Sequence, residues 1–324
     1  MSDIKKIKEQ INNIKTELSQ TKPELAEELE AILKKLETPQ EAKTEEEKIW
    51  KSVELARHIQ RPTTLDYISR ITENFMELHG DRCFGDDPAL IGGIAIFEGS
   101  PVTIIGHQKG QNMKENIKRN YGMAHPEGYR KALRLAKQAE KFNRPIFTFI
   151  DTSGAYPGIT AEERGIGEAI ARNLKELSIL KVPVICIIIG EGGSGGALGI
   201  GVGDRVYMLR NSIYSVISPE GCASILLRDA SRAKEAAKLM KLTAPYLLEF
   251  GIIDGIIEEP EGGAHTDIDA TASNIKETLS SALQQLKAKK PAQLIKERTQ
   301  KLFSLGVYDA LEKTPAIKKI SIDL

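Results

Sequence analysis

The glycine-rich segment at residues 190–196, which reads GEGGSGG, lies between a continuous apolar run and a short helical pattern. Glycine lets a ligand approach the main chain closely, and the first N–H groups of a helix have no partner inside it. Gly195, Gly196 and Ala197 are therefore predicted to offer backbone donors to a carbonyl oxygen or a developing oxyanion. Such an oxyanion hole needs no ionisable side chain.

The same segment fits three other interpretations. Its glycines match the G-x-G-x-x-G pattern of dinucleotide sites, but the acidic residue expected at the end of the next strand is missing. Ser194 lies at the centre of a G-x-S-x-G nucleophile elbow, and Asp254 and His265 follow in the order of a serine hydrolase triad. A loop whose glycines only permit close backbone packing is the simplest alternative. The oxyanion hole is favoured because glycines on both sides of Ser194 give more freedom than an elbow needs.

A second glycine turn, DTSGAYPG at residues 151–158, follows the apolar run 145–150. Gly154 and Ala155 are predicted to contribute further amide donors, and Pro157 stiffens the turn. Tyr156 is predicted to line a pocket, although an ordinary half-buried tyrosine fits the sequence equally well.

The two turns echo each other. PIFTFIDTSG (145–154) and PVICIIIGEG (183–192) both read as a proline, an apolar strand and a glycine turn, with their starts 38 residues apart. This separation fits one strand–helix unit used twice. We therefore expect both turns at the same edge of one sheet, where α/β proteins place their ligands.

The surrounding pattern predicts an α/β fold. The apolar runs 145–150 and 182–189 are continuous, which is typical of strands buried on both faces. Residues 91–97 and 102–106 are predicted to form a hairpin, and residues 127–142 and 160–180 long helices. Strands at 205–209 and 213–218 are expected to precede helices that surround a short apolar run at 252–257.

The N-terminal sixty residues carry no chemistry. Apolar residues at positions 4, 7, 11, 14 and 18, and again at 25, 29, 32 and 36, form helical stripes. Each stripe is too short for a free coiled coil, so we expect a packed helical hairpin or an arm that docks on a partner.

Composition excludes several classes of protein. Lys plus Arg and Asp plus Glu both total 45 in 324 residues, so no global charge favours nucleic acid or an anionic membrane. The three cysteines are far apart and the five histidines lack metal-ligand spacing, so neither a disulfide framework nor a metal site is expected. Without a long apolar stretch or a targeting pattern, the chain is expected to be cytoplasmic.

A basic segment interrupts this neutral composition. Residues 109–144 hold ten Lys or Arg against three acids, and Arg130, Arg134, Lys137 and Lys141 share one helical stripe. A solvated helix face and a site for a polyanionic ligand or acidic partner both fit this pattern.

At these residues the sequence resembles the carboxyltransferase alpha subunit of the bacterial-type, multisubunit acetyl-CoA carboxylases. The matching stretches run in order over about 200 residues: RPTTLDYI (61–68), IGGIA (91–95), IIGHQKG (104–110), PEGYRKALRLA (126–136), FIDTSGAYPG (149–158), EERGIGEAIARNLKE (162–176), IGEGGSGGALGIGVGD (189–204), YSVISPEGCASIL (214–226) and EPEGGAH (259–265). Ser153 departs from the family, which usually has proline there, but this change leaves the amide donors intact.

The resemblance implies a crotonase-like fold, in which repeated ββα units form a superhelix and paired backbone amides form oxyanion holes. It implies transfer of a carboxyl group from carboxybiotin to acetyl-CoA, which gives malonyl-CoA for fatty acid synthesis. In this family the base comes from the cofactor, which agrees with the absence of a convincing side-chain base here. Carried over by motif, Gly195, Gly196 and Ala197 hold a carbonyl oxygen of biotin or of the acyl group, and Gly154 and Ala155 help to close the hole. The resemblance further implies that substrate or biotin is contacted by Tyr156, Gly158, Gly192 and Gly193.

The resemblance also implies partners. Biotin is carried on the biotin carboxyl carrier protein, ATP is used by a separate biotin carboxylase, and a zinc-ribbon beta subunit completes the site. Two alpha and two beta subunits are expected in a heterotetramer that is active only as a complex. Within this chain we expect a helical extension (1–60), a crotonase-like carboxyltransferase domain (61–290) and a C-terminal helical tail (291–324), and no metal.

Overall fold

The fold is that of a computed structural model, which describes residues 44–306. The chain divides into two compact units between Lys48 and Ile49, and the described part of the first unit is residues 44–48. These residues open helix α3 (Glu45–Ala56) with a capping box, in which Thr44 and Glu47 exchange hydrogen bonds between backbone N–H and side-chain oxygen. The helical stripes predicted at residues 4–18 and 25–36 lie outside the described residues.

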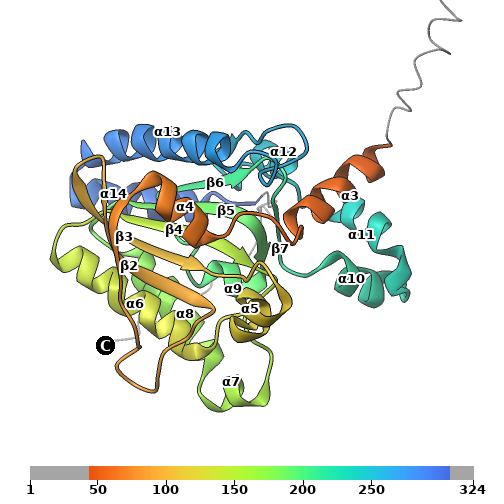
Figure 1. Ribbon diagram of the computed structural model, residues 1–324, viewed down its shortest axis with the longest axis horizontal. Helices are drawn as coiled ribbons and strands as arrows, with labels where there is room; N and C mark the ends of the chain where they lie inside the picture. The colour runs from red at the N-terminus through yellow and green to blue at the C-terminus, as the bar shows by residue number, and fades with distance from the viewer. Residues whose placement is uncertain (1–43, 307–324) are drawn as a thin grey trace, which may run out of the picture. The chain divides into compact units, whose positions relative to one another are not determined.

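An eight-stranded mixed sheet forms the centre of the described part of the second unit (Figure 1). Its order is β1-β2-β3-β4-β5-β6-β8, with β7 pairing β5. The first three strands are antiparallel, and the remaining pairings are parallel. The strands are β1 (Glu73–Glu77), β2 (Leu90–Phe97), β3 (Ser100–His107), β4 (Ile146–Thr152), β5 (Val184–Gly193), β6 (Arg205–Leu209), β7 (Ile213–Ser215) and β8 (Gly255–Ile257).

Helices connect and cover these strands. The α-helices after α3 are α4 (Thr64–Ile71), α5 (Met113–Lys118), α6 (Pro126–Lys141), α7 (Ile159–Glu163), α8 (Ile166–Ser178), α9 (Ser194–Leu198), α10 (Pro219–Cys222), α11 (Ala233–Met240), α12 (Ala244–Glu249), α13 (Ile268–Lys287) and α14 (Pro291–Phe303). Three short helical turns are η1 (Asn120–Gly122), η2 (Ala223–Leu227) and η3 (Ala230–Arg232). In the described ranges no helix has the length and apolar character needed to cross a bilayer.

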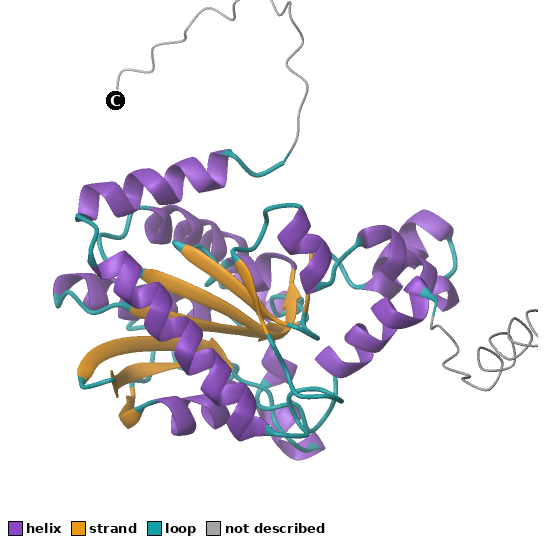
Figure 2. Cartoon of the chain, turned by 90° about the horizontal axis from the view of Figure 1, so that it is seen from above, coloured by secondary structure: helices purple, strands orange, loops and turns teal. Residues whose placement is uncertain are grey.

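The central strands are buried on both faces, as their continuous apolar runs predict. Along β5, Val184, Cys186 and Ile188 face a core shared with α6 and α8, whereas Ile185 and Ile187 face a core shared with α4 and α13. Figure 1 shows these helices on opposite sides of the sheet, and Figure 2 shows the sheet from above with helices packed around it. The two layers hold the ends of β4 and β5 in fixed positions.

Several predicted elements are confirmed, with local differences. The hairpin of β2 and β3 turns through Glu98 and Gly99, which both have positive φ, as a tight two-residue turn requires. The long helix predicted at 160–180 is instead α7 and α8, because Gly165 adopts a left-handed conformation (φ 77°) between them. Strand β7 ends at Ser215 rather than at residue 218.

The C-terminal helix α14 is anchored by a buried arginine. Arg298 is fully buried, and its guanidinium forms an ion pair with Asp204 (2.8 Å). It also donates to the carbonyls of Leu177, Leu180 and Val182, which end α8 and lead into β5. This helix therefore contributes to the packing behind the site.

Candidate active site

The two glycine turns meet at one edge of the sheet. Strands β4 and β5 run parallel, and Thr152 pairs with Gly192 where both strands end. A methyl group on Gly193 would lie 2.1 Å from the carbonyl oxygen of Ser153, and one on Gly196 would lie 2.4 Å from the carbonyl carbon of Gly154. The two turns therefore pack main chain against main chain, and glycine is required at both positions.

The glycine turn after β5 leads directly into α9, whose first residue, Ser194, has a left-handed φ of 51°. Among residues 44–306, the hydrogen bonds between elements do not use the N–H groups of Gly195 or Gly196. These groups belong to the first turn of the helix, where N–H groups have no helical acceptor. Gly195 is partly exposed, whereas Gly196 and Ala197 are buried. Gly195 and Gly196 are thus the backbone donors that this turn keeps available.

The glycine turn after β4 offers one comparable donor. The N–H of Gly154 donates to the Thr152 hydroxyl at 3.1 Å, so this amide is already engaged within the turn. Among the described residues no hydrogen bond between elements uses the N–H of Ala155, which is half-buried.

An apolar hollow of about 450 Å³ opens beside Ser194 and Gly195. Its other walls come from α9, from β7 and α12 with the residues that follow them, and from the segment after α14: Leu198, Tyr214, Ser215, Val216, Leu247, Ile252, Leu305 and Gly306. A carbonyl group presented to the Gly195 amide from this side has apolar surface around it. Water is then a weaker competitor for the backbone donors.

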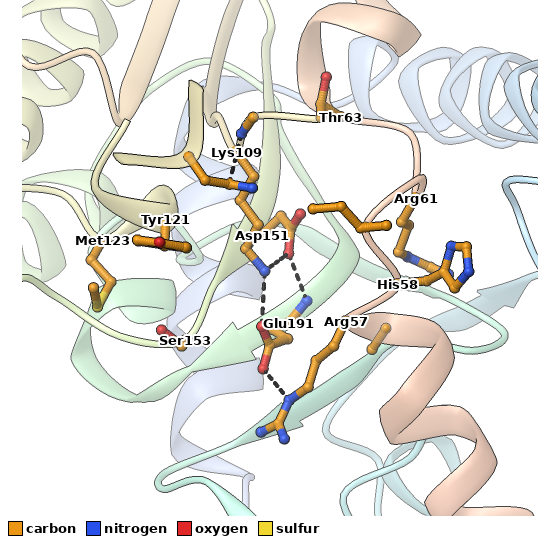
Figure 3. Close-up of a pocket in the computed structure, with 14 residues that line it drawn as sticks. Arg57, His58, Arg61, Thr63, Lys109, Tyr121, Met123, Asp151, Ser153 and Glu191 are labelled. Carbon is orange, nitrogen blue, oxygen red and sulfur yellow. Dashed lines mark hydrogen bonds and ion pairs between the residues drawn. The ribbon is translucent and has the colours of Figure 1, made fainter. Parts of the chain in front are cut away.

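A separate, charged cleft of about 520 Å³ is lined by residues at the start of both turns (Figure 3). Lys109, from the loop after β3, donates to Asp151 and to Glu191, both at 2.8 Å. The Glu191 N–H also donates to Asp151 (2.9 Å), and Arg57 holds the second oxygen of Glu191 at 2.8 Å. Asp151 begins one glycine turn and Glu191 the other, so this network, here called the Lys109 clamp (Arg57, Lys109, Asp151, Glu191), ties the two turns together.

The ion pairs of the clamp are strong because most of its charged groups are largely buried. Burial by itself opposes ionisation of Glu191, but Lys109 and Arg57 outweigh it and lower the pKa of this carboxyl from 4.5 to about 2. Burial likewise opposes the charge of Lys109, yet the two carboxylates raise its pKa above the ordinary value of 10.5. Glu191 and Lys109 are therefore both charged at neutral pH.

Comparison with known proteins identifies the family of this chain. Residues 1–306 match the family described as acetyl co-enzyme A carboxylase carboxyltransferase-like. The chain belongs to this family. It is 62% identical over 298 residues to the acetyl-coenzyme A carboxylase carboxyl transferase subunit alpha of Treponema denticola, covering 92% of this chain and 96% of that protein. It is 61% identical over 262 residues to the subunit of that name from Listeria monocytogenes, covering 81% and 82% of the two chains. The chain is accordingly an alpha-type carboxyltransferase subunit of acetyl-CoA carboxylase.

Solved structures show the fold. A transcarboxylase 12S structure superposes with a TM-score of 0.59 at 20% identity, covering 72% of this chain and 44% of that one. A Pseudomonas malonate decarboxylase hetero-dimer gives 0.54 at 18% identity, covering 67% and 91%. The predicted crotonase-like α/β core of this carboxyltransferase subunit is confirmed. The chain spans less than half of the transcarboxylase chain.

The alternative of a serine hydrolase is wrong. His265 stacks on His58, with ring centroids 3.9 Å apart, and Asp254 is paired with Lys301 and accepts the Val206 N–H at 2.7 Å. Neither side chain bonds to Ser194 or to the other, so the sequence order of a triad is not matched in space.

Other predicted binding residues of this family member divide into two groups. Gly192 and Gly193 line a narrow hollow with Ser153 and Glu191, next to the clamp. Tyr156 instead stacks on His125 with ring centroids 4.0 Å apart and packs against Gly158, and it is not among the residues that line the cleft or the apolar hollow.

Most of the basic side chains in the stripe on α6 already have partners within the chain. Arg130 pairs with Asp81 at 2.8 Å, Arg134 donates to the Gly80 carbonyl at 3.0 Å, and Lys137 pairs with Glu176. Within the described ranges, no group of three or more His, Cys, Asp or Glu side chains is arranged to hold a metal ion.

The Lys109 clamp was not predicted from the sequence. Asp151 and Glu191 each lie near the end of a buried strand, at the start of a glycine turn, and this placement was the available signal. Lys109 and Arg57 gave none, because each reaches its partners across 40 or more positions of sequence, as in the bond from Arg57 to Glu191.

Proposed function

We propose that this chain forms half of a carboxyltransferase site, in which a carboxyl group passes from carboxybiotin, held on the biotin carboxyl carrier protein, to acetyl-CoA. The product is malonyl-CoA, the precursor for fatty acid synthesis. The observation that carries the proposal is the pair of open amides at Gly195 and Gly196, set on a turn that the Lys109 clamp fixes from behind. The proposed partner is the zinc-ribbon beta subunit, in a complex of two alpha and two beta subunits together with the carrier protein and biotin carboxylase, in the cytoplasm.

The residues present fit a biotin ring. A ureido carbonyl needs N–H donors beside an apolar wall, and Gly195 supplies a donor where the apolar hollow begins. A methyl group placed on Gly195 would approach Ile170 no closer than 3.7 Å, so this face of the turn has room for a ligand. Carboxybiotin, when bound, supplies both the carboxyl group and the base for the acetyl α-proton.

The role of the chain is to bind and orient. Gly195 and Gly196 donate to the carbonyl oxygen on which negative charge develops, with Ala155 and the buried Ala197 completing the lining of the hole. Preorganised donors of this kind are each worth about 3 kcal/mol of barrier. The clamp keeps the two turns in register, so that the donors are in place before the substrate arrives.

Reconstitution tests this function. The chain is combined with the beta subunit and the carboxybiotin-loaded carrier, and labelled carboxylate is followed into malonyl-CoA. We expect Gly196→Val to abolish transfer, because the added carbons enter the space held by Gly154, and Ser194→Ala to retain most activity. A Ser194→Ala variant without activity, or label release without malonyl-CoA, would contradict the proposal.

A further inference from the structure

Helix α9 carries the open amides of Gly195 and Gly196, yet it has few side chains that could hold it in place. Its five residues read SGGAL, and of these Gly196 and Ala197 are buried. Leu198 is 41% exposed and lines the apolar hollow. A helix this short and this rich in glycine does not fix its own orientation. The direction of its donors must therefore be set by neighbouring elements.

One buried side chain reaches the carboxyl end of this helix. Asn173 lies on α8 and is fully buried. Its amide nitrogen donates to the carbonyl of Gly199, the residue that ends α9, at 2.9 Å. It also donates to the carbonyl of Tyr129, on α6, at 3.0 Å. The last carbonyls of a helix have no donor within that helix, so Asn173 satisfies a group that α9 leaves open. Asn173 thus joins helices α6, α8 and α9 at one point.

The amide oxygen of Asn173 gains nothing comparable. It is buried without a hydrogen-bond partner among the described residues. An unsatisfied oxygen in the core costs free energy, and an apolar side chain of similar volume would avoid this cost. The part of the side chain that the fold uses is therefore its pair of N–H groups.

Tyr129 makes a second contact with α9. Its hydroxyl donates to the carbonyl of Gly196 at 3.3 Å. Its ring packs on Gly199, where a methyl group would lie 2.5 Å from a ring carbon. Because Asn173 holds the main chain of Tyr129, the two side chains form one support for the helix. This support reaches α9 at two carbonyls, one in its middle and one at its end, and two fixed points restrain the rotation of a short rigid helix.

The same support connects the two halves of the oxyanion hole. Helix α8 follows the turn that carries Ala155, whereas α9 begins at the turn that carries Gly195. We propose that Asn173, together with Tyr129, is a positioning residue for the oxyanion hole. By pinning the carboxyl half of α9, the pair sets the direction of the Gly195 and Gly196 N–H groups at its other end. The inference rests on the proposed function. Both side chains act through the main chain and do not touch the substrate.

Kinetics of the reconstituted complex give the first test. Asn173→Leu removes both N–H groups at similar volume, and kcat for malonyl-CoA formation is expected to fall about tenfold or more, with KM for acetyl-CoA changed less than about twofold. Tyr129→Phe keeps the ring, removes only the hydroxyl and is expected to lower kcat about threefold without changing KM. This second variant keeps the test decisive if Asn173→Leu does not fold.

Thr271→Val is the matched control. The fully buried Thr271 hydroxyl also donates to a main-chain carbonyl, that of Asp267, at 2.9 Å, but it lies on α13, which packs on the opposite face of the sheet. We expect this variant to keep the kcat of the wild type. Unchanged kcat in Asn173→Leu and Tyr129→Phe, an equal loss in Thr271→Val, or a loss confined to KM would overturn the proposal.

A spectroscopic test reads a donor directly, without catalysis. The sequence contains two Ser–Gly peptides, at residues 153–154 and 194–195, one in each glycine turn. The full chain is made by cell-free synthesis with carbonyl-¹³C serine and ¹⁵N glycine, which leaves only these peptides visible in a carbonyl–amide correlation spectrum. We expect Asn173→Leu and Tyr129→Phe to move the Gly195 amide signal and Thr271→Val to leave it in place. The Gly154 amide, which is bonded to Thr152 within its own turn, is the internal reference.

The two tests fail in different ways. If the wild-type complex forms no malonyl-CoA, the proposed function is wrong, while the spectrum still reports whether Asn173 and Tyr129 set the position of the Gly195 amide. If the wild-type complex transfers the carboxyl group and the Gly195 signal is the same in Asn173→Leu and Tyr129→Phe as in the wild type, the positioning role is wrong.

Discussion

Replacing Lys109 with methionine tests the clamp most directly. The change keeps the length of the side chain and removes its charge, so that Asp151 and Glu191 face each other with Arg57 as the remaining cation. The pKa of Glu191 lies near 2 instead of 4.5, and this difference corresponds to about 3 kcal/mol of stability at neutral pH. Because removal of one partner from a buried ion pair leaves an uncompensated charge, we expect a loss of about 3 kcal/mol in the free energy of unfolding.

The sign of the pH dependence follows from the direction of the shift. A carboxyl whose pKa is lowered by folding stabilises the folded chain fully above its unfolded pKa, and this stabilisation disappears as the pH falls through the folded value. The gap between the wild type and Lys109→Met should therefore be widest above pH 4.5 and should close toward pH 2. Urea unfolding of both proteins at pH 7 and at pH 3.5 measures it.

Lys137→Met provides the matched control. Lys137 also pairs with one glutamate, Glu176, but its side chain is 41% exposed, and exposed pairs contribute less than about 1 kcal/mol. The reasoning is refuted if Lys109→Met costs no more than Lys137→Met, or if its cost is the same at both pH values.

Three further predictions concern packing and access. Arg298→Leu should lower the free energy of unfolding by about 4 kcal/mol in urea titrations, because the fully buried guanidinium is the partner of a buried carboxylate. Gly193→Ala should abolish carboxyl transfer by forcing the two turns apart, whereas Gly167→Ala, on an open helix face of α8, should leave activity unchanged and stabilise the chain by about 0.5 kcal/mol. A thiol reagent at pH 8 should modify the exposed Cys83 rapidly and Cys186 only on unfolding. The reason is that burial raises the pKa of the Cys186 thiol to about 11. Mass spectrometry of the peptides distinguishes the two modified cysteines.

The sequence predicted the parts of the site that depend on local pattern. Continuous apolar runs identified β4 and β5, and the glycine turns after them identified the edge where the donors lie. Strand β1 was missed because its residues, ENFME, do not form a continuous apolar run and it pairs only with β2. The break between α7 and α8 depends on one glycine with positive φ, which an amphipathic pattern does not reveal.

The side chains behind the turns could not be predicted, for a different physical reason. A lysine after a strand or a histidine at a strand end has many possible surroundings, and only the folded sheet decides which one it meets. Lys109 and His107 lie two residues apart, yet one joins two carboxylates and the other is fully buried without a hydrogen-bond partner for its ring among the described residues. Pairings of this kind are set by tertiary structure and leave no local periodicity in the sequence.

These surroundings also explain how a site built from main-chain amides keeps a constant electrostatic character. The charged groups that support the turns are fixed in one protonation state near neutrality, because Glu191 titrates near pH 2 and the pKa of Lys109 lies above its ordinary value. A backbone donor has no protonation state to lose, so its strength varies only with its position. The supporting side chains therefore need to hold the turns in place without titrating. Exchange of the Lys109 ammonium for an apolar group would bring the pKa of Glu191 upward, and the position of the donors would then become sensitive to pH.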